Sequence, residues 1–171
     1  MDALSKRINS LPISATLAMA AKARELKNRG IDIIGLSLGE PDFNTPEFIK
    51  DAAVKAVNDN WNSYSPVDGY ADLKEAICTK FKRHNQLYYD PSQIVVSTGA
   101  KQSIANVCMV LLDPGDEVLI PAPYWVSYSA IATLAESKST IIPSSIETDF
   151  KITPEQLEDA ISQKTKLIMF N

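Results

Sequence analysis

The chain has 171 residues, a formal net charge of -4 and an apolar fraction of 45%. This length and apolar content are sufficient to form a buried core. The charges are evenly spread without a block of Lys or Arg, which argues against nucleic acid or an anionic membrane as a partner. No apolar run reaches the length needed to cross a membrane.

The N-terminal segment has the outline of a secretory signal, because Lys6 and Arg7 precede a mostly small and apolar run over 11–23. Pro12 and nearby hydroxyl residues interrupt that run. Charged residues then continue it as far as Gly30, a residue type that commonly follows the last turn of a helix. We therefore expect an N-terminal helix in a cytoplasmic protein.

The cysteines and the histidine do not form a metal site or a redox motif. Cys78 and Cys108 lie in helix-like apolar patterns and are too far apart for a CxxC motif. Buried free thiols in a reducing compartment are the expected state. His84 lies on a charged helix end with no Cys or His beside it, so we expect no metal ligand there.

The first half of the chain mixes helical periodicity with one short apolar segment. We expect a strand over 33–38, a helix with Thr45 as cap and Pro46 as first residue, a polar loop over 62–69, and a helix marked by Leu73, Ile77 and Phe81.

The second half alternates strands and helices. We expect strands over 94–96, 117–121, 140–143 and 166–171, helices over 104–112 and 126–134, a tight turn over 113–116, and a last helix opened by a capping box at Thr153 and Gln156. This alternation predicts an α/β fold with a mainly parallel sheet. Ligands of such folds bind beyond the carboxyl ends of the strands.

One turn between a strand and a helix has the composition of a phosphate cradle. The six glycines form neither a GxGxxG nor a GxxxxGK[ST] pattern, so a dinucleotide fingerprint and a P-loop have no support. Ser97, Thr98, Gly99, Ala100 and Lys101, however, follow one expected strand and open the next helix. Free backbone N–H groups, the helix dipole and a lysine would together attract phosphate. Many α/β proteins have such a glycine for backbone reasons alone, so this turn by itself leaves both interpretations open.

Two further loops follow expected strands. Residues 121–125 read Pro-Ala-Pro-Tyr-Trp, and Trp125 could stack on a flat conjugated ring or pack in the core. Residues 39–42 read Gly-Glu-Pro-Asp, a tight turn that could expose the backbone N–H of Gly39. Taken singly, neither loop specifies a function.

Five motifs in order resemble those of the class I aminotransferases. They are Leu36–Phe43, then Tyr64-Ser65-Pro66 with Asp68-Gly69, then Thr98–Gln102, then Leu112–Val118, then Pro121–Trp125. The resemblance covers nearly the whole chain and is strongest to bacterial aspartate aminotransferases of the pyridoxal-phosphate (PLP) fold-type I superfamily.

The resemblance implies a role for each matching residue. Gly99, Ala100 and Lys101 would hold the phosphate of PLP, and Trp125 would stack on its pyridine ring beside the substrate. The backbone of Gly39 would contact the substrate carboxylate. Tyr64 would reach the PLP phosphate of the neighbouring subunit, which implies a homodimer with shared active sites.

The resemblance also implies an architecture. The fold would be the three-layer α/β/α large domain of the PLP-dependent transferases, truncated, with an N-terminal arm and small-domain segment over 1–45 and the large PLP-binding domain starting over 46–171. Family members are more than twice this length. None of the lysines lies in the context of the family's Schiff-base lysine, so the chain would hold no catalytic residue and would be inactive alone.

The implied reaction is amino transfer between L-aspartate and 2-oxoglutarate, giving oxaloacetate and L-glutamate. Relatives that also accept prephenate carry a lysine just before a Pro-Ser-Ala-Thr segment. Here Leu11 precedes Pro12-Ile13-Ser14-Ala15-Thr16, which argues mildly against prephenate. Three alternatives stay open: an aromatic or alanine aminotransferase, a C–S lyase on the same fold, or a non-catalytic fragment.

Overall fold

The structure is a computed structural model that describes residues 3–36 and 38–171. The chain divides into two compact units, one formed by Met1–Leu38 with Gly99–Asn171 and the other by Gly39–Thr98. Each unit is described by itself below. The boundary predicted at residue 45 between a small-domain and a large-domain segment stays a prediction.

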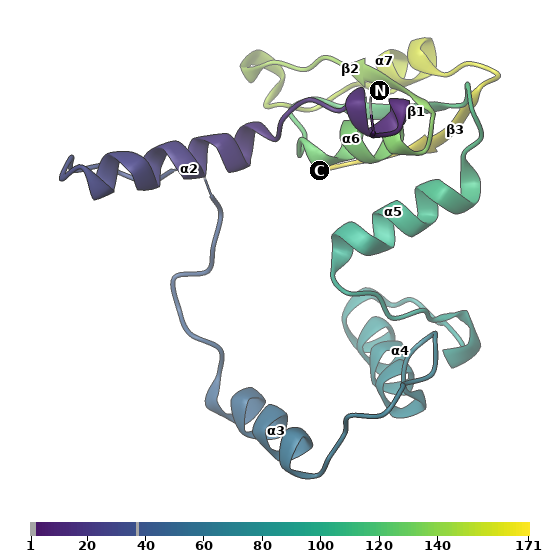
Figure 1. The fold of residues 1–171 in the computed structure, drawn as a ribbon. Coiled ribbons are helices and arrows are strands. Elements are labelled where there is room, and N and C mark those ends of the chain that lie inside the picture. Colours follow the sequence, from purple (N-terminus) through teal and green to yellow (C-terminus); the bar gives the residue numbers. More distant parts are fainter. Residues whose placement is uncertain (1–2, 37) are drawn as a thin grey trace. The chain divides into compact units, whose positions relative to one another are not determined.

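A three-stranded parallel sheet forms the centre of the first unit (Figure 1). Its strands are β1 (Glu117–Pro121), β2 (Lys138–Ile142) and β3 (Thr165–Ile168), in the order β2-β1-β3. The middle three residues of β1 are completely buried. Burial on both faces is typical of a central strand in a parallel sheet.

Helices cover both faces of this sheet. The unit contains α1 (Lys6–Asn9), α2 (Ala15–Asn28), α5 (Ala100–Leu111), α6 (Ser127–Leu134), the short η2 (Ile146–Thr148) and α7 (Pro154–Ala160). The chain leaves β1 for β2 on one side and returns past β1 to β3 on the other. Right-handed crossovers in opposite directions place their helices on opposite faces. In Figure 1, α6 and α7 accordingly lie on the two sides of the sheet, which confirms the predicted α/β/α layering.

The core of the first unit lies between the sheet and the helices α5 and α6. It joins Cys108 and Leu112 to Val118, Ile120, Ile131, Ala132, Ala135 and Met169, all of them buried. Cys108 is a free thiol, and burial raises its pKa. Cys78 is also free. Both thiols are unpaired as predicted, but Cys78 is only partly buried, so the predicted burial is confirmed for Cys108 alone.

The second unit consists of two helices and their connections. They are α3 (Glu47–Asn58) and α4 (Ala71–Asn85), followed by the short η1 (Pro91–Gln93). The predicted cap of α3 is wrong. Pro46, not Thr45, is the N-cap, and the proline ring has no atom that can accept a hydrogen bond.

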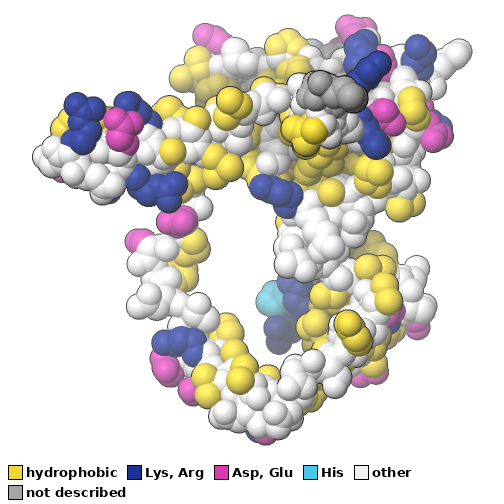
Figure 2. Space-filling model, viewed as in Figure 1, with side chains coloured by type: hydrophobic (Ala, Val, Ile, Leu, Met, Phe, Trp, Pro, Cys, Tyr) yellow, Lys and Arg dark blue, Asp and Glu magenta, His cyan; other side chains and the backbone are white. Residues whose placement is uncertain are grey.

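The apolar face predicted for α3 is not covered by the other described residues of its unit. Phe48 and Val57 are both about three-quarters exposed, at 73% and 76%, and none of the residues of the helix is buried. Figure 2 shows apolar side chains gathered along this helix. The periodicity predicted the helix correctly, whereas the burial it implied is not present among the described residues.

Two of the predicted strands are absent. Residues 33–36 and 38 are irregular, and residue 37 lies outside the described residues. Residues 94–96 have no strand pairing within the described part of the chain, and the N–H of Val96 donates to the carbonyl of Asp68, which lies in a turn, at 3.0 Å. A β-strand requires a neighbouring strand with complementary hydrogen bonds, which neither segment has among the described residues.

The predicted ends of the other strands are nearly correct. β2 begins at Lys138 and ends at Ile142, whereas the expected range was 140–143. β3 ends at Ile168, although the N–H of Met169 still donates to the carbonyl of Leu119 at 2.9 Å. Strand β1 has the predicted bounds.

The helix signals of the sequence are confirmed at α2 and α7. Gly30 has φ 78° directly after the C-cap of α2. At α7 the N–H of Gln156 donates to the Thr153 hydroxyl at 3.2 Å, and the Thr153 N–H donates to Gln156 Oε1 at 2.9 Å. Among the described residues, no helix is long and apolar enough to cross a membrane.

The amino ends of the strands are tied together by Glu117. Its carboxylate accepts a hydrogen bond from the Ser162 hydroxyl at 2.6 Å and pairs with Lys138 at 3.2 Å. The Ser162 hydrogen bond, followed by Lys138, holds the pKa of Glu117 below its usual value of 4.5. This carboxylate therefore connects β1 to β2 and to the segment before β3.

A depressed carboxyl pKa makes stability depend on pH. The contribution of Glu117 is present above pH 4.5 and is lost as the pH falls through the lower pKa of the folded state. We expect Glu117→Gln to make the free energy of unfolding less dependent on pH below 4.5. Urea unfolding at several pH values measures this, with Glu158→Gln on the exposed face of α7 as the charge control. Parallel pH profiles for Glu117→Gln and the unmodified chain would contradict it.

Candidate functional site

The N-terminus of α5 forms an open turn built on Gly99. This residue is the N-cap, with φ 81° and ψ 163°, and it contributes no side-chain cap. A positive φ of this size is readily adopted by glycine and strained for other residues. The first N–H groups of an α-helix have no intrahelical acceptor, and the helix dipole adds partial positive charge to them. The turn thus offers donors to an anion.

Lys101 and Trp125 lie together beside this turn. The ammonium of Lys101 is 4.8 Å from the centre of the Trp125 ring. Trp125 follows β1, in the loop that contains the cis peptide bond Ala122–Pro123, and its residue is 36% exposed. The fold therefore places a positive charge, a partly open aromatic surface and a helix N-terminus at one end of the sheet.

Tyr128 supports the position of Trp125. The two rings make an edge-to-face contact, with centres 5.7 Å apart and an interplanar angle of 84°. The Tyr128 hydroxyl donates to the carbonyl of Phe170, just beyond β3, at 3.2 Å. The start of α6 is thereby linked to the carboxyl end of β3.

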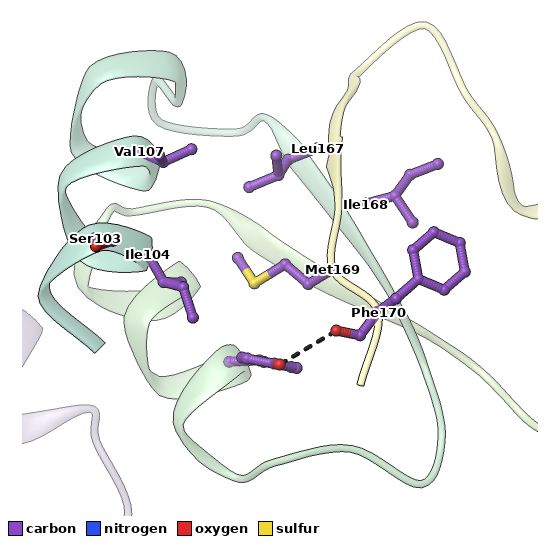
Figure 3. Close-up of a pocket in the computed structure, with 8 residues that line it drawn as sticks. Ser103, Ile104, Val107, Leu167, Ile168, Met169 and Phe170 are labelled. Carbon is purple, nitrogen blue, oxygen red and sulfur yellow. Dashed lines mark hydrogen bonds between the residues drawn. The ribbon is translucent and has the colours of Figure 1, made fainter. Parts of the chain in front are cut away.

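An apolar cavity of about 280 Å³ opens beside this link (Figure 3). Side chains from α5 line one wall, and residues of β3 and its extension line the other. The lining residues are Ser103, Ile104, Val107, Tyr128, Leu167, Ile168, Met169 and Phe170. The lining of this cavity offers apolar surface and the hydroxyl groups of Ser103 and Tyr128, and it includes no charged side chain.

A second cavity of about 280 Å³ lies at the carboxyl ends of β1 and β3. It is lined by Pro121, Ala122, Pro123, Phe150, Lys151, Ile152, Phe170 and Asn171. Loops at this edge of a parallel sheet usually carry the ligand site. The ammonium of Lys151 is paired with Asp149 at 2.6 Å. The candidate site therefore lies at the edge of the sheet that the sequence predicted.

Gly39 and Tyr64 belong to the second unit. Gly39 is exposed, and a Cβ placed on it would meet nothing within 4 Å. Tyr64 is fully exposed. Their predicted contacts with substrate and with the neighbouring subunit's cofactor stay predictions, as do the roles of Gly99, Ala100, Lys101 and Trp125.

Sequence analysis did not single out Tyr128 or Phe170. Tyr128 is three residues after Trp125, and this spacing places two side chains on one side of a helical turn. That signal could have identified Tyr128. Phe170 contributes through its backbone carbonyl, which sequence patterns do not reveal. The described residues include no cluster of His, Cys, Asp and Glu able to hold a metal ion.

Residues 31–171 match the family described as aminotransferase class I and II, so the chain belongs to this family. Its parallel α/β sheet is part of the fold of the PLP-dependent aspartate aminotransferases, as the structural match below shows.

Individual relatives cover almost all of the chain. It is 51% identical to the aspartate/prephenate aminotransferase of Nitrosomonas europaea over 98% of its length and 42% of the relative's. It is also 51% identical to the aspartate aminotransferase of Bacillus subtilis, over 98% of this chain and 43% of that one. The structure of the Thermus thermophilus aspartate aminotransferase with maleate matches with a TM-score of 0.94 at 40% identity, covering 98% of this chain and 44% of that one. The chain thus spans less than half the length of the relatives it matches.

Proposed function

We propose that the chain is the N-terminal portion of a PLP-dependent aminotransferase that converts L-aspartate and 2-oxoglutarate into oxaloacetate and L-glutamate. The observation that carries this proposal is the cluster of Gly99, Lys101 and Trp125 at the carboxyl edge of a sheet belonging to this family. Because the chain covers about 43% of the Bacillus subtilis relative, the activity is proposed for the whole protein.

The cluster fits a cofactor with a phosphate and a flat ring. The N–H groups of Ala100 and Lys101 and the Lys101 ammonium supply positive charge for the phosphate, and the glycine turn leaves space for its approach. Trp125 supplies the aromatic surface for the ring. When bound, PLP supplies an electron sink for the negative charge that develops at the substrate Cα.

The residues of this chain bind and orient rather than move protons. The backbone N–H of Gly39 would donate a hydrogen bond to the substrate carboxylate. The Tyr64 hydroxyl would donate one to the cofactor phosphate bound in the partner subunit. We assign no proton-moving lysine to this chain, because none of its lysines matches that position of the family. The 171-residue chain alone would accordingly be inactive, and the whole protein would be a cytoplasmic homodimer.

The proposed substrates are dicarboxylates. The names of the relatives specify aspartate, and maleate in the Thermus thermophilus structure is itself a dicarboxylate. The relative named for both aspartate and prephenate and the relative named for aspartate are equally similar to this chain, at 51%. Overall similarity therefore does not decide the question of prephenate, and the absence of a lysine before Pro12 favours aspartate.

The experiment expresses the complete gene with PLP and follows oxaloacetate formation. We expect kcat/KM for L-aspartate to exceed that for L-alanine or L-phenylalanine by at least about 10-fold, since a site built to pair a second carboxylate rejects substrates lacking it. Prephenate is tested as amino acceptor beside 2-oxoglutarate. Preference for alanine or phenylalanine would indicate an alanine or aromatic aminotransferase of the same family. Release of pyruvate and ammonia from a cysteine conjugate would favour the C–S lyase.

A further inference from the structure

The loop that carries Tyr64 joins α3 to α4 and is held at both ends. Tyr64 and Val67 are fully exposed in its centre. On the side of α3, the N–H of Trp61 donates to the carbonyl of Ala56 at 3.0 Å. On the side of α4, the carbonyl of Tyr70 accepts from the N–H of Lys74 at 3.0 Å. Each end of the loop is therefore fixed to a helix.

Two aromatic rings close the base of this loop. The centres of the Trp61 and Tyr70 rings are 5.3 Å apart at an interplanar angle of 67°, an edge-to-face geometry. Such pairs stabilise beyond the burial of their area, because the positive edge of one ring meets the negative face of the other. The contact joins residues at the two ends of the segment that contains Tyr64.

The second half of the loop contacts Val96 through Asp68 and Gly69. The N–H of Val96 donates to the carbonyl of Asp68 at 3.0 Å, and Gly69 packs against the Val96 side chain. Within the loop, the N–H of Gly69 donates to the carbonyl of Pro66 at 3.1 Å. The Asp68 carboxylate pairs with Lys74, whose side chain is only 13% exposed. These contacts leave little freedom at the base, while the centre stays open.

We propose that Trp61 and Tyr70 are positioning residues for Tyr64. Their ring contact holds the loop in the form in which the Tyr64 hydroxyl can donate to the cofactor phosphate of the partner subunit. The conformational entropy of the loop is then lost on folding rather than on cofactor binding, which strengthens binding. This inference rests on the proposed function, because it uses the role proposed for Tyr64.

The test is a double-mutant cycle on the holoenzyme from the complete gene. We expect Tyr64→Phe to raise the PLP dissociation constant by about 10- to 100-fold, since it removes a hydrogen bond to a charged group. Trp61→Ala should raise it by about 3- to 10-fold, in line with an aromatic pair, and Trp61→Phe should restore most of the affinity. In the Tyr64→Phe background, Trp61→Ala should have almost no further effect.

A matched control is available in the same unit. Phe81 and Tyr89 form a similar edge-to-face pair, with centres 5.8 Å apart at 62°, away from the loop. Tyr89→Ala should leave PLP affinity unchanged, even where it lowers the thermal unfolding temperature as much as Trp61→Ala does.

The cycle separates failure of this inference from failure of the proposed function. Equal effects of Trp61→Ala with and without the Tyr64 hydroxyl would overturn the positioning role while leaving the cofactor assignment intact. An effect of Trp61→Ala without any effect of Tyr64→Phe would overturn it as well. A complete protein that neither binds PLP nor transfers amino groups would instead overturn the proposed function.

Discussion

Gly69→Ala is expected to lower the free energy of unfolding by roughly 2–5 kcal/mol, the sum of a backbone and a packing penalty. Gly69 has φ 103°, which an alanine adopts only with strain. A Cβ at this position would lie 2.5 Å from Cγ2 and 2.9 Å from Cβ of Val96. Because Val96 is also hydrogen-bonded to Asp68, it cannot move away without breaking that contact. Urea unfolding of the protein measures the change.

Gly115 provides the control that separates the two penalties. It has a similar φ of 94°, but a Cβ there would meet nothing within 4 Å. Gly115→Ala should therefore cost only about 1–2 kcal/mol, the backbone penalty alone. Adding Val96→Ala to Gly69→Ala removes the 2.5 Å contact but leaves the one at 2.9 Å, so stability should recover in part. Equal losses for the two glycine variants would show that close packing against Val96 is not important.

Strand β1 could be predicted with its correct ends because all of its signals are local. Three consecutive apolar residues lie between the Asp113–Asp116 turn and the proline at 121, and all three are completely buried. A buried parallel strand needs only such a run and its boundaries to be recognised. The capping box at Thr153 and Gln156 is local in the same sense, and the structure shows both of its hydrogen bonds.

The segments 33–38 and 94–96 were predicted wrongly because strand formation depends on a neighbour. Their apolar composition is as strand-like as that of β1. The apolar composition of a segment indicates that its side chains tend to be buried. A strand also needs a second segment about 4.8 Å away, whose backbone groups form hydrogen bonds with it. Val96 instead bonds to the turn at Asp68. The resemblance to the class I aminotransferases likewise does not show which segments of this chain pair with each other as strands.

Two of the residues named from the sequence lie together in the fold, but the contacts around them could not be predicted. Lys101 and Trp125 were named from two separate motifs, and the fold brings the ammonium within 4.8 Å of the ring centre. The hydrogen bond from Tyr128 to the Phe170 carbonyl spans 42 residues of sequence and depends on the start of α6 lying near the segment that follows β3. No local pattern encodes such a contact. Gly39 and Tyr64 are exposed within their own unit, so their proposed roles depend on groups outside it.

Lys101→Met is expected to weaken PLP binding by the complete protein by about 10- to 100-fold, because it would remove the charge-assisted hydrogen bond that we propose between Lys101 and the phosphate. Methionine keeps most of the side-chain length and apolar contact with Trp125, so the change isolates the charge. The PLP dissociation constant of the apoenzyme, followed by absorbance, measures the effect. Added salt should weaken binding less in Lys101→Met than in the unmodified protein, since screening acts on the charge that the variant lacks.

Lys80→Met is the matched control for this substitution. Lys80 also places its ammonium over an aromatic ring, 5.3 Å from the centre of Phe81, but it lies on α4 rather than at the start of α5. Both variants lose one positive charge and its cation–ring interaction and keep the apolar part of the side chain, so loss of a phosphate contact is what would make PLP binding by Lys101→Met differ. Equal PLP affinities and equal salt dependence in both variants would mean that Lys101 only covers Trp125. The backbone N–H groups after Gly99 would then account for phosphate binding by themselves.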